Sequence, residues 1–317
     1  LQGKPPEKIP DSLAVDDLGL LPDLDWDADF PEHWNPTLEG ASEALADFLD
    51  GPVERYSARR DRPAVRGTSR LSPFLAHGQL GPRQVWAAAH ASGASDTKDG
   101  FKYLSEIAWR EFAYHLLVHF PHTPTEALND AYRQFPWQED EAYLHAWQKG
   151  RTGYPIVDAG MRELWHTGWM HNRVRMIVAS LLVKHLLQPW QEGARWFWDT
   201  LVDADLASNT MGWQWSAGSG ADAAPYFRIF NPMLQGEKFD PKGVYVRRWV
   251  PELKDLPDKH LHTPWEAPAE VLDKAGVTLD DTYPRPIIEH KAGRQRALDA
   301  LQENKARNEA RSEDSGD

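Results

Sequence analysis

The segment from residue 201 to 217 gathers groups that carry charge, donate hydrogen bonds and stack on flat rings. Asp203 and Asp205 are separated by one residue, and Asn209 follows four residues after Asp205. A carboxylate is tolerated inside a protein only beside a cation or several N–H donors. Arg175 is the natural partner for Asp203. On these residues alone, a structural salt bridge is the preferred interpretation.

Two further stretches carry residues that are able to bind a ligand or take part in chemistry. Residues 68 to 72 read TSRLS, in which hydroxyl groups, backbone N–H groups in a turn and Arg70 together could bind an anion. The helical pattern over 101–120 places Glu106, Trp109 and Arg110 on one face. Without other evidence, a TSRLS segment is more often an ordinary capped loop. Glu106, Trp109 and Arg110 are what favour an anion-binding role for it here.

The spacing over 171–187 predicts a helix with two different faces. One face is apolar and is expected in the core: Val174, Ile177, Val178, Leu181 and His185. The other carries Asn172, Arg175, Met176 and Ala179. Because this second face is flanked by Trp169, it is expected to form the wall of a site rather than an exposed surface.

The charge distribution is uneven. The chain has 317 residues and a formal net charge of −13, but residues 1–50 alone carry −11, which leaves −2 for the other 267 residues. Seven arginines lie between residues 53 and 83, against two acids. A local basic face on a near-neutral body is compatible with phosphate binding, and a solvated charged loop is an equally good interpretation.

Several classes of protein are not supported. No apolar run is long enough to span a membrane, and the absence of cysteine excludes disulfides and thiolate metal sites. The histidines at 115, 119 and 122 lack an acidic ligand nearby, so no metal site is predicted. The match to a dinucleotide fingerprint at 218–223 lacks its preceding strand. No serine-protease-like arrangement is visible.

The body is expected to be all-α, with helices over 38–50, 81–91, 101–120 and 171–187. The best strand candidate is 245–250, and long irregular connections are expected over 121–155 and 203–245. Residues 1–35 have the composition of an interdomain linker or strap, 36–300 form the main domain, and 301–317 form a polar tail. Because the first residue is Leu, a preceding segment is expected.

Six motifs carry a family resemblance, in order: TSRLSP, EIAWREF, GYPIVDAGMREL, WMHNRVRM, DADLASNTMGWQW and DAAPYFRIFNP. Together, over about residues 35–300, they resemble the flavin-binding domain of the photolyase/cryptochrome family, most closely bacterial class I cyclobutane-pyrimidine-dimer photolyases. The resemblance implies an all-α FAD-binding domain whose N-terminal α/β antenna domain precedes this chain. It also implies a cytoplasmic bacterial monomer that associates with the nucleoid when on DNA, and no membrane.

The resemblance implies a bent, fully reduced FAD in a helical cradle. Tyr56 and residues 68–72 would hold its phosphates with help from Arg110, Asp205 would meet the isoalloxazine edge, and Asn209 would face N5. The complete set of implied cofactor contacts is Tyr56, Thr68, Ser69, Arg70, Leu71, Ser72, Arg110, Trp169, Asn172, Arg175, Asp203, Asp205 and Asn209. The antenna chromophore is not identified.

The resemblance also implies the substrate, DNA that contains a cyclobutane pyrimidine dimer flipped from the duplex. Excited reduced flavin would give the dimer an electron, the two cyclobutane bonds would split, and the electron would return. The implied DNA contacts are Arg60, Glu106, Trp109, Asn172, Arg173, Met176, Trp215 and Gln235. Phosphate contacts position a duplex without reading its sequence, and the affinity is expected to fall as salt rises.

Two catalytic roles follow from the same resemblance. Because a carboxylate beside a developing dimer anion would repel it, we expect burial to raise the pKa of Glu106, so that it donates a hydrogen bond as the acid. Trp213, Trp190 and Trp137 match a chain of three tryptophans that carries electrons from the surface to oxidised flavin.

Three alternatives stay open. A blue-light cryptochrome would bind FAD without repairing DNA, although Asn209 is typical of photolyases, where plant and animal cryptochromes tend to use Asp or Cys. A single-strand-specific enzyme would differ in its DNA preference, and a DNA-binding scaffold would lack flavin. (6-4) photolyases carry a histidine pair within the stretch where Asn172 and Met176 stand here, which favours cyclobutane dimers.

Overall fold

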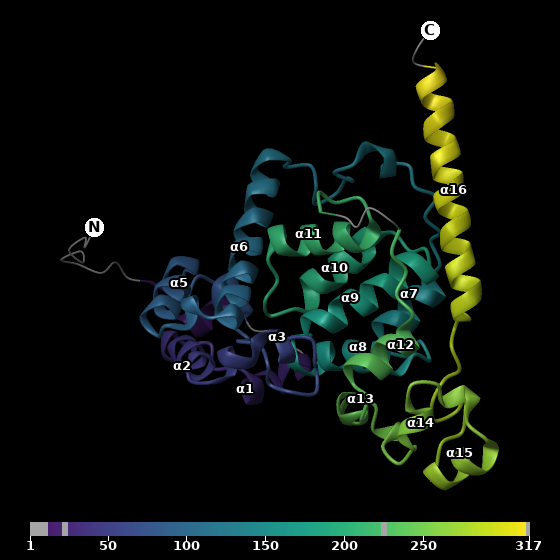
Figure 1. Ribbon diagram of the computed structural model, residues 1–317, viewed down its shortest axis with the longest axis horizontal. Helices are drawn as coiled ribbons and strands as arrows, with labels where there is room; N and C mark the ends of the chain where they lie inside the picture. Colours follow the sequence, from purple (N-terminus) through teal and green to yellow (C-terminus); the bar gives the residue numbers. More distant parts are fainter. Residues whose placement is uncertain (1–11, 21–24, 223–226, 315–317) are drawn as a thin grey trace, which may run out of the picture.

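The computed structural model describes residues 12–20, 25–222 and 227–314. Within these ranges the chain forms helices and no strand, apart from an isolated bridge between Leu279 and Tyr283 (Figure 1). The expected all-α architecture is therefore confirmed. The α-helices are α1 (Phe30–His33), α2 (Leu38–Leu49), α3 (Tyr56–Arg59), α4 (Ser72–Ala76), α5 (Pro82–Ala91), α6 (Lys98–His119), α7 (Glu141–Gln148), α8 (Pro155–Thr167), α9 (Asn172–Ser180), α10 (Trp190–Thr200), α11 (Leu206–Ala217), α12 (Pro232–Phe239), α13 (Val244–Trp249), α14 (Asp258–Leu261), α15 (Ala269–Ala275) and α16 (His290–Asp314).

Two apolar cores organise these helices. The smaller of these two joins α2, α3, α4, α5 and the first half of α6, with the rings of Phe48, Tyr56 and Tyr103 packed against one another, and a third, minor cluster contains Phe135, Leu187 and Ala300. The larger one is built from α8, α9, α10, α11 and α13. Figure 1 shows α6 standing between the two groups of helices, while α16 runs along the opposite edge of the molecule. The residues that could act on a ligand come from both sides of this junction.

The predicted apolar face of the helix after residue 171 is confirmed. Val174, Ile177, Val178, Leu181 and His185 are all 1% exposed or less. The helix is not regular throughout, because α9 ends at Ser180 and continues as a π-helix from Leu181 to His185. Such wide turns are rare and shift the faces that follow them.

The predicted strand over 245–250 was wrong, because this segment forms α13. The Asp240 carboxylate accepts hydrogen bonds from the backbone N–H groups of Tyr245 (3.1 Å) and Val246 (2.9 Å). It therefore satisfies donors that the first turn of a helix leaves free. Tyr245 and Val246 are both fully buried, so tertiary packing decides the conformation of a β-branched, aromatic sequence.

The expectation of an irregular chain over 203–245 was also wrong, since it contains α11 and α12. The Asp205 carboxylate accepts the N–H of Ser208 at 2.7 Å and so begins α11. α11 lacks a separate apolar side because it is covered on several faces, by α6, α9 and α10. The motif at 222–232 extends through residues 223–226, which lie outside the described residues.

The C-terminal region is helical past the expected boundary at residue 300. α16 continues to Asp314, and Asn304, which is 3% exposed, donates a hydrogen bond of 2.8 Å to the carbonyl of Ala131. At the other end of the chain, α1 contacts α8. The domain boundaries at 35 and 300 stay predictions. None of the described helices is long and apolar enough to cross a membrane.

Candidate flavin and DNA site

Arg70 lies at the centre of the predicted anion-binding segment. Its backbone is left-handed, with φ of 54°, which is uncommon for a residue with a side chain. Its guanidinium carbon lies 4.4 Å from the ring centroid of Trp169 and 5.3 Å from that of Trp34. Burial lowers the pKa of Arg70, partly offset by the charge of Glu163. Among the described residues, the guanidinium has no hydrogen-bond or ion-pair partner, so it is free to bind an anion.

The rings around Arg70 are themselves held in place. Trp169 is 7% exposed and donates its indole N–H to Oγ of Ser72 at 3.2 Å. Trp34 donates its indole N–H to the carbonyl of Thr167 at 2.7 Å. Trp34 lies in the segment expected to be a linker, and its ring lies 6.5 Å from that of Trp169. Sequence reasoning missed Trp34, since nothing in its local pattern indicates a site.

The other members of the predicted phosphate set lie at different depths. Thr68 and Ser69 are half-buried, and Leu71 is 1% exposed in the smaller core. Tyr56 is buried between aromatic rings, and burial raises its pKa, partly offset by the charge of Arg60. Leu71 therefore anchors the segment to the core, while Thr68, Ser69 and Arg70 stay half-buried and Ser72 is exposed.

The predicted ion pair between Arg175 and Asp203 is present. Nη2 of Arg175 lies 2.7 and 3.0 Å from the two carboxylate oxygens of Asp203, and its Nε donates to the carbonyl of Met170 at 2.7 Å. The Asp203 side chain is 2% exposed, so the carboxylate depends on this cation. The Arg175 guanidinium also lies 5.9 Å from the Trp169 ring, which connects the pair to the Arg70 cluster.

A second polar cluster forms around Asp205, where α6 meets α11. The phenol of Tyr114 donates to the Asp205 carboxylate, and Nη2 of Arg110 lies 3.9 Å from the same oxygen. Arg110 also donates to the carbonyl of Leu75 in α4 at 3.2 Å. Burial and the neighbouring Asp205 raise the pKa of Tyr114, with a counteracting effect from Arg110. Tyr114 was missed, although it lies four residues after Arg110 on the same helix face.

Asn209 and the expected substrate contacts differ in accessibility. The Asn209 amide nitrogen donates to the carbonyl of Ala194 in α10 at 2.9 Å, which fixes the amide. Trp109 is 42% exposed and Asn172 is exposed, whereas Met176 and Trp215 are half-buried. These four side chains reach solvent from α6, α9 and α11, so each is accessible to a large ligand.

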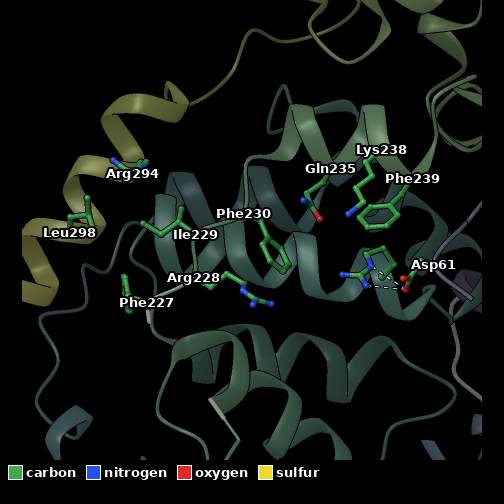
Figure 2. A pocket seen from close by; sticks show the side chains of 11 residues that line it. Asp61, Phe227, Arg228, Ile229, Phe230, Gln235, Lys238, Phe239, Arg294 and Leu298 are labelled. Atoms are coloured by element: carbon green, nitrogen blue, oxygen red, sulfur yellow. Dashed lines mark hydrogen bonds and ion pairs between the residues drawn. The ribbon is translucent and has the colours of Figure 1, made fainter. Parts of the chain in front are cut away.

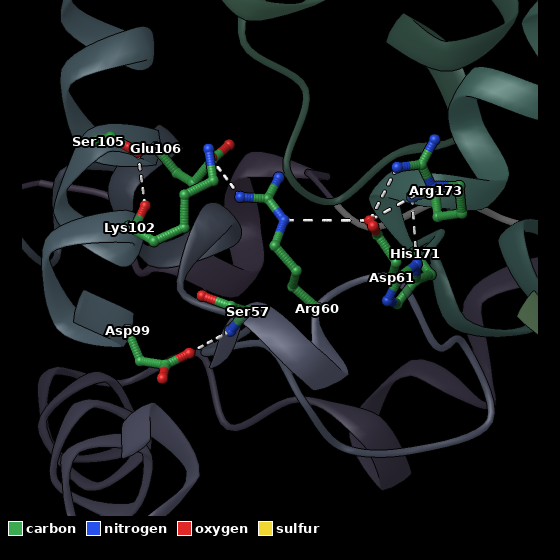
Figure 3. Close-up of polar contacts among 9 residues, drawn as sticks. All are labelled: Ser57, Arg60, Asp61, Asp99, Lys102, Ser105, Glu106, His171 and Arg173. Carbon is green, nitrogen blue, oxygen red and sulfur yellow. Dashed lines mark hydrogen bonds and ion pairs between the residues drawn. The ribbon is translucent and has the colours of Figure 1, made fainter. Parts of the chain in front are cut away.

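The expected rise in the pKa of Glu106 was wrong. Burial, the largest single influence, would raise the pKa, but the hydrogen bond and charge of Arg60, reinforced by Lys102, lower it below its usual value. The Glu106 carboxylate accepts a hydrogen bond from Arg60 and lies 3.0 Å from Nζ of Lys102 (Figure 3). The pairing of Glu106 with Arg60, which lies 46 residues earlier, was not predicted from the sequence. Glu106 is therefore a carboxylate here.

Arg173 and Gln235 line an open hollow of about 570 Å³ beside the N-terminal end of α9 (Figure 2). The residues that line it are Asp61, Arg173, Phe227, Arg228, Ile229, Phe230, Gln235, Lys238, Phe239, Arg294 and Leu298. Four of these are cationic and one is acidic. A concave, cationic surface of this kind fits phosphate groups.

Two of the three tryptophans of the expected electron chain are buried, Trp213 and Trp190, each at 2% exposure, while Trp137 is half-buried. The Trp213 ring packs edge-on against Phe197 at 5.0 Å and Trp147 at 6.1 Å. These ring contacts are the ones expected of core packing, and they involve neither Trp190 nor Trp137. The order of electron transfer through the three tryptophans therefore stays a prediction.

The structure thus brings some of the predicted residues into three connected groups and leaves the others apart. Arg70, Ser72, Trp169, Arg175 and Asp203 form one connected group. Arg110 joins Asp205, and Arg60 joins Glu106. The three tryptophans and Tyr56 lie in the cores.

Comparison with known proteins gives a consistent result. A family model described as the FAD binding domain of DNA photolyase matches residues 103–303. The chain belongs to the photolyase/cryptochrome family. It is 54% identical over 297 residues to the deoxyribodipyrimidine photo-lyase of Agrobacterium fabrum, an alignment that covers 93% of this chain and 62% of that protein. It is 42% identical over 276 residues to cryptochrome-1 of Arabidopsis thaliana, covering 84% of this chain and 40% of that protein.

A solved structure supports the fold assignment. The bacterial class III photolyase from Agrobacterium tumefaciens superposes with a TM-score of 0.92 at 53% identity, covering 95% of this chain and 63% of that one. The chain therefore spans less than two thirds of the length of the photolyases it matches. This similar structure is described as a class III photolyase, whereas the motifs resemble those of class I photolyases.

Proposed function

We propose that the protein binds FAD and uses light to split cyclobutane pyrimidine dimers in DNA. When bound and reduced, FAD would supply the electron that opens the cyclobutane ring. The observation that carries the proposal is Arg70, a half-buried guanidinium without a hydrogen-bond or ion-pair partner among the described residues, packed against two tryptophan rings next to a row of hydroxyl groups. A diphosphate is the anion that matches this arrangement within the family.

The remaining cofactor contacts follow from the two polar clusters. Arg175, neutralised by Asp203, would present an ion pair rather than a bare charge to the flavin ring. Asp205, held by Tyr114 and capping α11, would offer its remaining acceptor capacity to the ring edge. Asn209, with its amide nitrogen fixed on α10, would direct the amide oxygen toward N5. These groups are preorganised by neighbouring helices, which lowers the cost of binding.

The substrate contacts would come from exposed and half-buried groups that flank the proposed cofactor site. Trp109 and Trp215 would pack on the fused bases, and Met176 would contact their edge. Glu106, as a carboxylate, can only accept hydrogen bonds, so it would accept one from the imide N–H of a base. The N–H groups of Arg60 would then donate hydrogen bonds to the carbonyl oxygens of the bases, where negative charge develops after electron transfer.

The DNA backbone would lie along the cationic hollow. Arg173, Arg228, Lys238 and Arg294 line it together with Gln235. Phosphate contacts of this kind position a duplex, while the extruded dimer is recognised in the site. The (6-4) lesion is disfavoured because Asn172 and Met176 stand in the segment where enzymes for that lesion carry a histidine pair.

The decisive experiment is illumination of purified, reduced protein with DNA that contains cyclobutane dimers, together with a dark control. Light-dependent loss of dimers is expected on duplex DNA. If FAD binds but no dimer is lost in the light, the repair proposal is overturned and a cryptochrome-type photoreceptor becomes the alternative, since the chain is also 42% identical to cryptochrome-1 of Arabidopsis thaliana. Repair confined to single strands would instead indicate a single-strand-specific enzyme.

Cofactor binding can be tested separately from repair. Arg70→Ala should lower FAD content and weaken FAD affinity by about 10- to 100-fold, because a charge-assisted contact to a phosphate contributes about 1.5–3 kcal/mol. Arg62→Ala removes an exposed arginine that precedes this segment and serves as the control. Flavin absorbance of the purified protein and titration of the FAD-free form measure both. Equal FAD affinity in the two variants would contradict the proposed phosphate contact.

A further inference from the structure

Asp61 lies between two arginines that come from distant parts of the chain. Its Oδ1 accepts hydrogen bonds from Nη2 (2.9 Å) and Nε (3.3 Å) of Arg173, at the start of α9. On its other side, Nε of Arg60 lies 4.0 Å from the same oxygen. Figure 3 shows the carboxylate placed between the two guanidinium groups.

This contact belongs to a longer row of alternating charges. Arg60 donates to Glu106, which also pairs with Lys102, so the order across the site is Lys102, Glu106, Arg60, Asp61 and Arg173. The row joins α6 to α9. The side chains of Arg60 and Arg173 are 16% and 19% exposed, so both are restrained rather than free in solvent.

The negative charge of Asp61 is unexpected in a cationic hollow. Asp61 is the one acid among the described residues that line the cationic hollow. A carboxylate at that position repels phosphate groups and neutralises part of the attraction of the neighbouring arginines. Asp61 fixes the separation and direction of the guanidinium groups of Arg60 and Arg173, which lie on different elements. This geometric contribution explains why an acid is placed there.

We propose that Asp61 is a positioning residue for DNA binding. It lowers the affinity for undamaged duplex and thereby increases the preference for DNA that contains the lesion. A restrained Arg173 fits the displaced phosphates around an extruded dimer and a restrained Arg60 stays directed at its bases, whereas unrestrained arginines would also reach the regular phosphates of straight DNA. This inference rests on the proposed function, and it assigns a role to a residue outside the proposed cofactor and base contacts.

The test is Asp61→Asn, which keeps the shape and removes the charge. Dissociation constants are measured in the dark for one duplex with a cyclobutane dimer and for the same duplex without it. The variant should bind undamaged DNA about fivefold more tightly, and the ratio of the two affinities should fall by a similar factor. The slope of log K against log salt should steepen by about 0.9, because one more phosphate contact is gained.

Two variants and one measurement serve as controls. Glu54→Gln removes an exposed acid of the same segment and should leave the ratio unchanged. Asp61→Glu keeps the charge and should give a ratio nearer to that of the wild type than Asp61→Asn does. Thermal unfolding establishes that each variant is folded, and Asp61→Ser replaces Asp61→Asn if the latter is not.

The outcomes separate the two proposals. An unchanged affinity ratio in a folded, neutral variant at position 61 overturns the positioning role, as does a parallel loss of affinity for both duplexes. Wild-type protein without any preference for the dimer-containing duplex would instead contradict the proposed function itself.

Discussion

At the scale of single residues, the charged neighbours of a side chain determine its protonation state and its availability to a ligand more than its burial does. Glu106 is partly buried, and burial alone would favour its acid form. Arg60 and Lys102 reverse that preference, so the group is an acceptor. Asp203 likewise depends on Arg175, whereas Arg70 lacks any such partner among the described residues. The unpaired group is the one available to a ligand.

The ionised state of Glu106 makes stability dependent on pH. Its folded-state pKa is lowered from the ordinary 4.5, so its ion pairs contribute stability above that value and lose it as the pH falls through the lowered pKa. Glu106→Gln should therefore cost about 1 kcal/mol or less at about pH 6, and progressively less as the pH falls below 4.5. Urea unfolding of both proteins over this range measures the difference. A gap that is independent of pH would contradict the assignment.

Trp213 gives a second prediction at this scale, which rests on the proposed function. Trp213→Phe removes the most easily oxidised side chain from a buried site while keeping an aromatic ring. Photoreduction of the oxidised flavin should be lost, whereas repair by chemically reduced protein should stay largely intact. Transient absorption and the repair assay measure the two activities. Trp147→Phe, which alters a ring neighbour, is the control that should preserve photoreduction.

At the scale of elements, the sequence predicted helices where one apolar face repeats and failed where it does not. The core face of α9 follows the expected spacing residue by residue. α11 was missed because it is covered on several sides and so lacks an amphipathic pattern. α13 was mistaken for a strand because its caps, Asp240 and the left-handed Gly243, precede the segment that was considered.

The close approach of α10 and α11 depends on a glycine. A Cβ at Gly193 would collide with the ring of Trp213, whereas a Cβ at Gly212 would meet nothing within 4 Å. Gly193→Ala should lower the free energy of unfolding by about 1–3 kcal/mol through overpacking. Gly212→Ala should raise it by about 0.4–1 kcal/mol, since it restricts the unfolded chain. Chemical denaturation measures both, and equal effects would contradict this packing.

The site could be predicted in part from sequence. The motifs indicated Arg70, Asp205 and the pairing of Arg175 with Asp203, because these residues lie within recognisable segments. Asp61 and Trp34 were missed, since their partners lie 112 and 133 residues away along the chain. Contacts over such separations depend on how the helices pack, which a local pattern does not contain.

At the scale of the whole molecule, the net charge is a poor guide to binding. The value of −13 is dominated by the first fifty residues, and the hollow beside α9 is cationic. The ends of the chain are also less peripheral than their composition indicates. α16 extends past residue 300 and contacts the segment around Ala131, so the expected polar tail forms part of a packed helix.

Removing that contact should affect global stability. Asn304→Ala removes the buried one of two amides that donate to the Ala131 carbonyl, the other being that of Asn308, and should lower the free energy of unfolding by about 0.5–1.5 kcal/mol. Glu309→Ala, at an exposed position on the same helix, should change it by about 0.5 kcal/mol or less. Thermal and urea unfolding provide the values. A loss as small as that of the control would show that this end of α16 is held weakly.

The indole of Trp34 bears on how the molecule can be dissected. Shortened versions that start at residue 36, where composition places the beginning of the main domain, would retain every motif and yet lack one wall behind Arg70. Such fragments should purify paler than versions that begin ahead of Phe30, even if both fold. Anyone trimming this polypeptide for crystallisation or engineering should therefore count the preceding stretch as part of the binding unit.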